Sequence, residues 1–203
     1  MKYIITEQQY KLLTEDEDRK ILKLPSVDVF GDWEGLQAYL NKKGNPLFSI
    51  SGDLDLNRSK IKYLDNLVSV DGNLNLAFSE ILYLDNLVSV GGDLNLYGTT
   101  IQSLGNLESV GGYLELGGSK IESLGDLKSV GGTLNLFNTP IESLGSLKFV
   151  GGNLNIILTK IETLGNLEYV RGKLDLRKTP LSKTTTEEEI RKQVEVGKVI
   201  FIK

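Results

Sequence analysis

Residues 89–108, SVGGDLNLYGTTIQSLGNLE, and residues 109–128, SVGGYLELGGSKIESLGDLK, repeat one pattern at one spacing. Valine recurs every twenty positions from Val70 to Val170, with Ile50 one period earlier. From each of these positions the chain runs apolar-x-Gly-x-Leu-x-Leu-x-x-Ser/Thr-x-Ile, followed by x-x-Leu-x-x-Leu-x-x-Val. A fixed period of this length is the signature of a solenoid in which each repeat forms one coil.

The apolar columns predict how one coil is built. Leu94 and Leu96 stand two apart, so we expect them to point inward from a short strand while Asn95 points outward. Ile101, Leu104 and the following apolar positions line the rest of the coil. One coil cannot bury these side chains alone, so neighbouring coils must stack and share a continuous core.

Glycines and hydroxyl residues form two further columns. Gly92 has a counterpart in every coil, and we expect this position to need positive φ or close backbone approach. The position before it also holds Ser51, Asp71 and Arg171, so there we expect glycine to be merely tolerated. The hydroxyl column predicts a structural ladder that satisfies buried backbone groups. It comprises Ser59, Ser79, Thr99, Ser119, Thr139, Thr159 and Thr179.

Composition narrows the function classes. The 203 residues carry 23 basic and 27 acidic side chains, a net charge of -4, which argues against partners such as nucleic acid or an anionic membrane. There is no cysteine and no histidine, hence no disulfide, thiolate nucleophile or imidazole base or ligand. We therefore expect no enzyme, no cofactor and no metal site. With no signal-peptide pattern and no run of ~20 apolar residues, a cytoplasmic location is expected.

The repeat resembles leucine-rich repeats, through Leu-x-Leu-x-x-Ser/Thr-x-Ile in successive coils. It differs from that pattern because Ser or Thr replaces Asn and a Gly-Gly corner precedes the strand. In this respect it is similar to receptor L domains, most closely at residues 107–116, LESVGGYLEL. Similar Gly-Gly-x-Leu-x-Leu repeats occur in bacterial and phage proteins. The resemblance implies a mainly β solenoid with a parallel sheet and mixed α/β caps.

The period breaks at both ends. We expect an N-terminal cap at 1–45, a seven-coil solenoid at 46–181 and a C-terminal cap at 182–203. In the first cap, a strand at 2–5 and a helix from Glu7 into the charged run at 15–20 are expected. A second helix should follow Asp32, with Trp33, Leu36 and Leu40 on one face.

The tail pattern predicts a helix followed by a strand. Thr185 or Thr186 would cap the helix, Ile190 and Val194 would pack on the last coil, and Gly197 would end the helix. The last six residues, 198–203, KVIFIK, are typical of a strand.

The outward positions of the strands are the candidate binding surface. The column of residues that point outward from the middle of the strands, such as Asn95, is polar. It predicts either a hydrogen-bonded ladder or a recognition strip. The next outward column, two residues further along each coil, contains several apolar side chains. Apolar side chains beside a polar column favour a partner site. The predicted partner-binding residues are Tyr97, Tyr113, Phe137, Ile157, Asn95, Glu115, Asn135 and Asn155.

Three functional hypotheses follow. The first is a non-enzymatic protein-binding or scaffold module that presents the repeat sheet to another protein. The second is a structural or assembly protein of phage type that self-associates through its ends, with 198–203 as the pairing strand. The third is a glycan-binding protein, for which Glu115 between Tyr97 and Tyr113 is the local indication; cleavage would need a second carboxylate about 5–9 Å away in a cleft.

Overall fold

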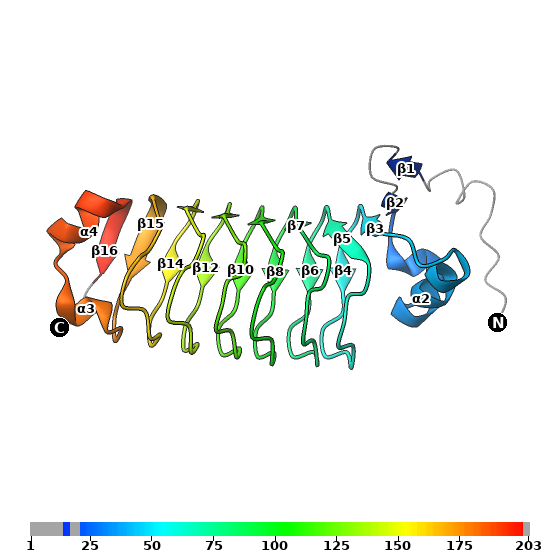
Figure 1. Cartoon of the computed structure of the whole chain (residues 1–203), viewed down its shortest axis with the longest axis horizontal. Coiled ribbons are helices and arrows are strands. Elements are labelled where there is room, and N and C mark those ends of the chain that lie inside the picture. The colour runs from blue at the N-terminus through cyan, green and yellow to red at the C-terminus, as the bar shows by residue number, and fades with distance from the viewer. Residues whose placement is uncertain (1–13, 17–20, 201–203) are drawn as a thin grey trace.

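The computed structural model describes residues 14–16 and 21–200 and forms an elongated parallel β-solenoid (Figure 1). Successive coils of twenty residues are stacked along the long axis, so the predicted fold class is confirmed. Six coils are complete between Ile50 and Val170. The predicted seventh coil starts at Val170 but passes into helix α3 (Leu181–Thr184) before it closes.

Each coil contributes two short strands, one on either side of the Gly-Gly corner. The first column consists of β3 (Phe48–Ile50), β5 (Leu67–Val70), β7 (Ser89–Val90), β9 (Ser109–Val110), β11 (Ser129–Val130) and β13 (Phe149–Val150). The second consists of β4 (Leu54–Asp55), β6 (Leu74–Asn75), β8 (Leu94–Asn95), β10 (Leu114–Glu115), β12 (Leu134–Asn135) and β14 (Leu154–Asn155). Strand β15 (Tyr169–Asp175) runs through both columns.

The register follows the sequence period. Val90 pairs with Val110 and Leu94 pairs with Leu114, each twenty residues apart in parallel strands. Equivalent side chains therefore lie beside one another along the solenoid. Leu94, Leu96 and their counterparts in the following coils are fully buried in one continuous core, as the alternation predicts.

The hydroxyl column forms the predicted structural contacts in four coils. The Oγ1 atoms donate to the carbonyl oxygen three residues earlier, at 2.7–2.8 Å, and the side chains are buried. These residues are Thr99, Thr139, Thr159 and Thr179. In the two coils nearest the N-terminal cap the Oγ atoms of Ser59 and Ser79 have no partner among the described residues.

The Gly-Gly corner is governed by close backbone approach. A Cβ on Gly92 would lie 2.9 Å from the carbonyl carbon of Gly72, and φ is not positive there. A Cβ on Gly111 would lie 2.0 Å from the carbonyl oxygen of Gly91. The expectation that this first position merely tolerates glycine is therefore wrong for the middle coils, because adjacent corners are in contact. Positive φ belongs instead to a second corner, as at Gly105 (φ +57).

The N-terminal cap extends the first strand column. Strand β1 (Thr14–Asp16) is antiparallel to β2 (Ile21–Leu24), which pairs in parallel with β3. The helix expected to reach residues 15–20 is wrong at Thr14–Asp16, because these residues pair with Ile21–Lys23 instead of coiling. The strand expected at 2–5 lies outside the described residues.

The second predicted helix of this cap is confirmed. A 3-10 turn η1 (Val27–Phe30) leads into α2 (Trp33–Lys42), where the Asp32 carboxylate accepts from the Gly35 N–H at 2.7 Å. Trp33, Leu36 and Leu40 are buried on one face. The Trp33 ring packs against Phe48 of β3, so the helix covers the open end of the core.

The C-terminal cap closes the opposite end. Helix α4 (Glu187–Gln193) starts at a capping box formed by Thr186 and Glu189, and Ile190 is buried as predicted. Strand β16 (Glu195–Ile200) pairs in parallel with β15; residues 201–203 lie outside the described part. Gly197 does not end the helix as expected but lies within β16, where a Cβ would be 2.5 Å from the carbonyl oxygen of Arg171.

Candidate partner-binding face

The candidate surface consists of the outward-facing residues of the β4–β15 column, from the residue that precedes each short strand to the third residue that follows it. We call it the strand-exit face. All eight predicted residues lie on it, since they occupy equivalent positions of coils whose strands pair in register. Tyr97 and Phe137 are 44% and 41% exposed, whereas Tyr113 and Ile157 are partly buried.

The side chains of the polar column form hydrogen bonds with the backbone turns in which the apolar residues lie. The Oδ1 atoms of Asn95, Asn135 and Asn155 each accept the backbone N–H two residues later at 3.1 Å. Those N–H groups belong to Tyr97, Phe137 and Ile157. The amide oxygens are therefore committed to the local turn, and their predicted role as direct partner contacts stays a prediction.

Glu115 is the centre of a hydrogen-bond network across three coils. Its carboxylate accepts from the Tyr113 hydroxyl, from the Gly117 N–H at 2.7 Å and from Asn135 Nδ2 at 2.9 and 3.0 Å. Asn155 Nδ2 continues the chain by donating to Asn135 Oδ1 at 2.9 Å. Burial, with a further contribution from the hydrogen bond to Glu115, raises the pKa of Tyr113 to about 12. The phenol is thus protonated near neutral pH and donates its hydrogen bond to Glu115.

The structure brings four predicted residues into one shallow hollow. A depression of about 280 Å³ is lined in part by Tyr113, Asn135, Asn155 and Ile157. Tyr97 and Asn95 lie outside it, nearer the N-terminal end of the solenoid. The predicted binding residues therefore do not form one continuous site, since only part of them line this hollow.

Two exposed apolar residues of this face were missed by the sequence interpretation. Phe78 and Leu158 are 54% and 40% exposed, and their φ values are 56° and 60°. The left-handed conformation costs a non-glycine residue on the order of 1–2 kcal/mol. Equivalent positions of other coils hold Gly98 and Gly118, with φ of +67° and +66°. An apolar residue where other coils place glycine was the available signal.

Near the N-terminal end, the exposed aromatic residues cover one another. The Phe78 ring meets Tyr97 edge-on, with 5.3 Å between the ring centroids. The guanidinium of Arg58 lies 5.9 Å from the Phe78 centroid. These contacts shield part of the apolar surface and leave less of it for a partner.

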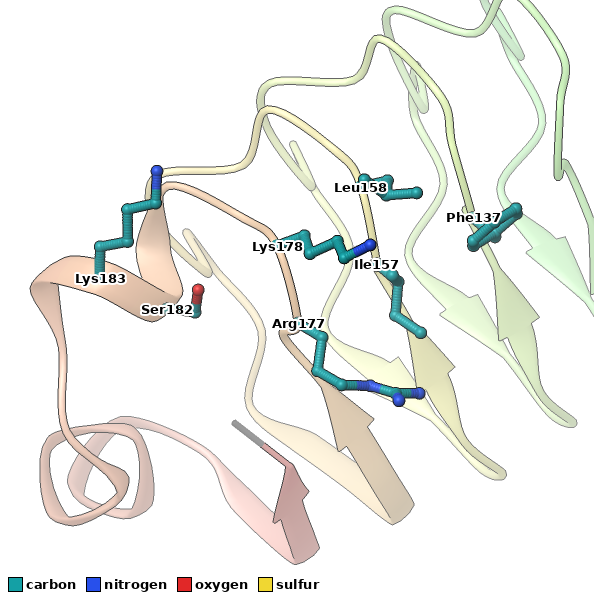
Figure 2. A pocket seen from close by; sticks show the side chains of 7 residues that line it. All are labelled: Phe137, Ile157, Leu158, Arg177, Lys178, Ser182 and Lys183. Carbon is teal, nitrogen blue, oxygen red and sulfur yellow. The ribbon is translucent and has the colours of Figure 1, made fainter. Parts of the chain in front are cut away.

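At the C-terminal end, the same face opens into a hollow of about 860 Å³. Its apolar lining comes from Phe137, Ile157 and Leu158, and its cationic lining from Arg177, Lys178 and Lys183 (Figure 2). The first five residues belong to three successive coils, and Lys183 lies on α3. The unclosed seventh coil thus forms one wall, because its chain turns into α3.

The cationic groups differ in how they are paired. Arg177 is bound to Asp175 through Nε–Oδ1 and Nη2–Oδ2 contacts of 2.9 and 2.7 Å, which raise the pKa of the guanidinium. Lys178 and Lys183 form no ion pair with any residue in the described ranges. The hollow therefore combines an apolar floor with two unneutralised ammonium groups.

Other surfaces also carry exposed aromatic or acidic groups. Tyr63 stacks on Tyr83 and Phe149 stacks on Tyr169, at centroid distances of 6.0 and 5.2 Å. Between the N-terminal cap and the first coil is a cavity of about 490 Å³ whose lining includes Asp28, Asp32, Glu34, Asp53 and Asp55. Across residues 14–16 and 21–200, no three Asp or Glu side chains converge as a metal site requires. No helix in those ranges is long and apolar enough to cross a bilayer.

Comparison with protein-family models, with curated proteins and with solved structures found no match for this chain.

Proposed function

We propose that this chain is a non-enzymatic protein-binding or scaffold module that presents its strand-exit face to another protein. The observation that carries the proposal is that Tyr97, Phe137 and Leu158 are held in water on a repeated, hydrogen-bonded turn. Large apolar side chains beside polar groups are typical anchors of protein interfaces. Because the turns are fixed before binding, association loses little conformational entropy.

The test is capture of a partner by variants of this face. Bait protein with Tyr97→Ser and Phe137→Ser is compared with wild type on extract of the native host, and the affinity for the captured partner is then measured. Loss of an anchor should weaken binding by roughly thirtyfold, the effect of about 2 kcal/mol. Tyr83→Ser is the matched control, because it removes an exposed aromatic ring that stacks on Tyr63 elsewhere on the surface. Equal capture by the double variant and wild type would refute the assignment of this surface.

A second candidate function is self-association through the ends, as in an assembly protein of phage type. The observation that favours it is that β16 continues the parallel ladder beyond β15, so it has a second edge on the far side from β15. Arg191 Nη1 donates to the carbonyl oxygen of Val196 at 2.9 Å, which occupies one acceptor of this strand. Light scattering with and without residues 198–203 tests it: a concentration-independent monomer in both forms contradicts it.

We also propose that the coils are related to leucine-rich repeats, closest to receptor L domains of bacterial or phage type. The support is the Leu-x-Leu pair of each coil, whose first leucine lies on a parallel strand and whose second follows that strand directly. A cytoplasmic location is proposed with it, supported by the complete lack of cysteine.

A further inference from the structure

The apolar floor of the 860 Å³ hollow is not explained by folding. Leu158 adopts a φ of 60°, which glycine or asparagine adopts at less cost, and its side chain remains 40% exposed. Asn138 fills the equivalent position of the preceding coil. Leucine at position 158 therefore adds neither a favourable backbone conformation nor full burial, although it enlarges the apolar surface beside Phe137 and Ile157.

The charge around this floor is positive, whereas the chain as a whole carries a net charge of -4. Figure 2 shows the Lys178 side chain extending from its coil back toward Ile157 and Leu158, with Lys183 standing on α3 at the end of the hollow. Within the described part of the chain no acidic side chain lines the hollow, and nearby Asp175 is neutralised by Arg177. An anion lying on the apolar floor would therefore meet ammonium groups and no uncompensated carboxylate of that lining.

We infer that this hollow binds a small amphipathic anion, namely an alkyl or aryl chain that ends in a carboxylate. The chain lies on Phe137, Ile157 and Leu158, and the carboxylate is bound by the Lys178 ammonium beside this floor, with Lys183 adding positive charge from α3. The volume of about 860 Å³ lies within the range of about 300–1,000 Å³ typical of small-molecule sites, and few polar groups among apolar ones are the usual lining. This site shares Phe137, Ile157 and Leu158 with the proposed protein-binding face, but it needs no protein partner, because the positive charge is supplied by lysines of the hollow itself.

Isothermal titration of the full chain with decanoate tests the inference, with decyltrimethylammonium as a probe of equal chain length and opposite charge, both below their micellar concentrations. Decanoate should bind saturably at one site, and the cation should not. Replacing Lys178→Asn together with Lys183→Gln should weaken decanoate binding by roughly tenfold or more, since charge-assisted contacts are lost. Added salt should weaken binding to wild type.

Two single variants distinguish binding of decanoate in the hollow from nonspecific binding elsewhere on the surface. Leu158→Asn should weaken decanoate binding at unchanged circular dichroism, because asparagine suits the backbone but removes the apolar floor. Lys60→Gln, which removes one positive charge at an exposed position in the first coil, should leave the affinity unchanged. No saturable binding, equal binding of the cation, or an unaltered affinity in the lysine double variant would each overturn the inference. If decanoate fails but Leu158→Asn abolishes capture of a protein partner, the hollow belongs to the protein interface and the small-anion assignment is wrong.

Discussion

Two glycines of one coil should respond to alanine for different physical reasons. Gly111 lies where adjacent corners touch: a Cβ there would lie 2.0 Å from the carbonyl oxygen of Gly91, while the Gly111 N–H donates to the Val90 carbonyl oxygen at 2.8 Å. Gly118 has φ of +66°, and a Cβ added to it would meet open space. Close packing leaves no room for the first change, whereas only backbone conformation opposes the second.

The expected magnitudes differ accordingly. Gly111→Ala must separate two corners, so it combines overpacking of about 1–3 kcal/mol with the weakening of one or two hydrogen bonds of about 1 kcal/mol each, which gives about 2–5 kcal/mol. Gly118→Ala should cost about 1–2 kcal/mol. Gly118→Asn should cost less than Gly118→Ala, because Asn138 already adopts φ of 55° at the equivalent position.

Urea unfolding followed by far-ultraviolet circular dichroism measures these differences, with midpoint and slope compared among the three variants and wild type. The order of stability should be wild type, Gly118→Asn, Gly118→Ala and then Gly111→Ala. A stability of Gly111→Ala within about 0.5 kcal/mol of wild type, the range of inconsequential surface changes, would refute the claim that the corners are in contact.

Three further predictions concern single side chains. Thr139→Val removes the hydroxyl that donates to the Leu136 carbonyl oxygen at 2.8 Å, so it should destabilise the fold by about 1 kcal/mol in thermal unfolding. The pKa of Tyr113 is raised from 10.0 to about 12, so the stabilising contribution of the protonated phenol is complete below pH 10 and is lost as the pH rises through 12. Tyr113→Phe should therefore lessen the loss of stability at alkaline pH. Glu115→Gln should lower the pKa of the phenol in an ultraviolet titration. Thr186→Ala removes the N-cap of α4 and should cost about 1 kcal/mol in chemical unfolding, with no change if the capping box contributes nothing.

The stacking of coils was predictable because the same apolar and glycine pattern recurs every twenty residues along the sequence. Val90 and Val110 pair where a twenty-residue period places them, and Leu94 and Leu96 are buried as alternation requires. Each copy of the pattern supports the others, so no single ambiguous residue decides the fold. The incomplete seventh coil could not be predicted in the same way, because Thr179 and Leu181 still match the pattern while the chain already turns into α3.

The candidate surface was predictable only in part. Tyr97 and Phe137 stand at a fixed position after each strand, so counting residues found them. Phe78 and Leu158 lie one position further, where the backbone turns to positive φ and alternation no longer says which way a side chain points. Contacts between corners, such as that of Gly111 with Gly91, depend on the spacing of two coils and are not visible within one copy of the repeat.

The central claim is that like positions of successive coils lie beside one another at the spacing of parallel strands. Because the chain has no cysteine, a spin label can be placed at chosen sites on one exposed column, in the pairs Glu80→Cys with Lys160→Cys and Lys60→Cys with Lys160→Cys. At about 4.8 Å per coil, pulsed electron resonance should give backbone separations of about 19 Å and 24 Å over four and five coils. Equal distances in the two pairs, or a separation far above this step per coil, would contradict the stacked solenoid.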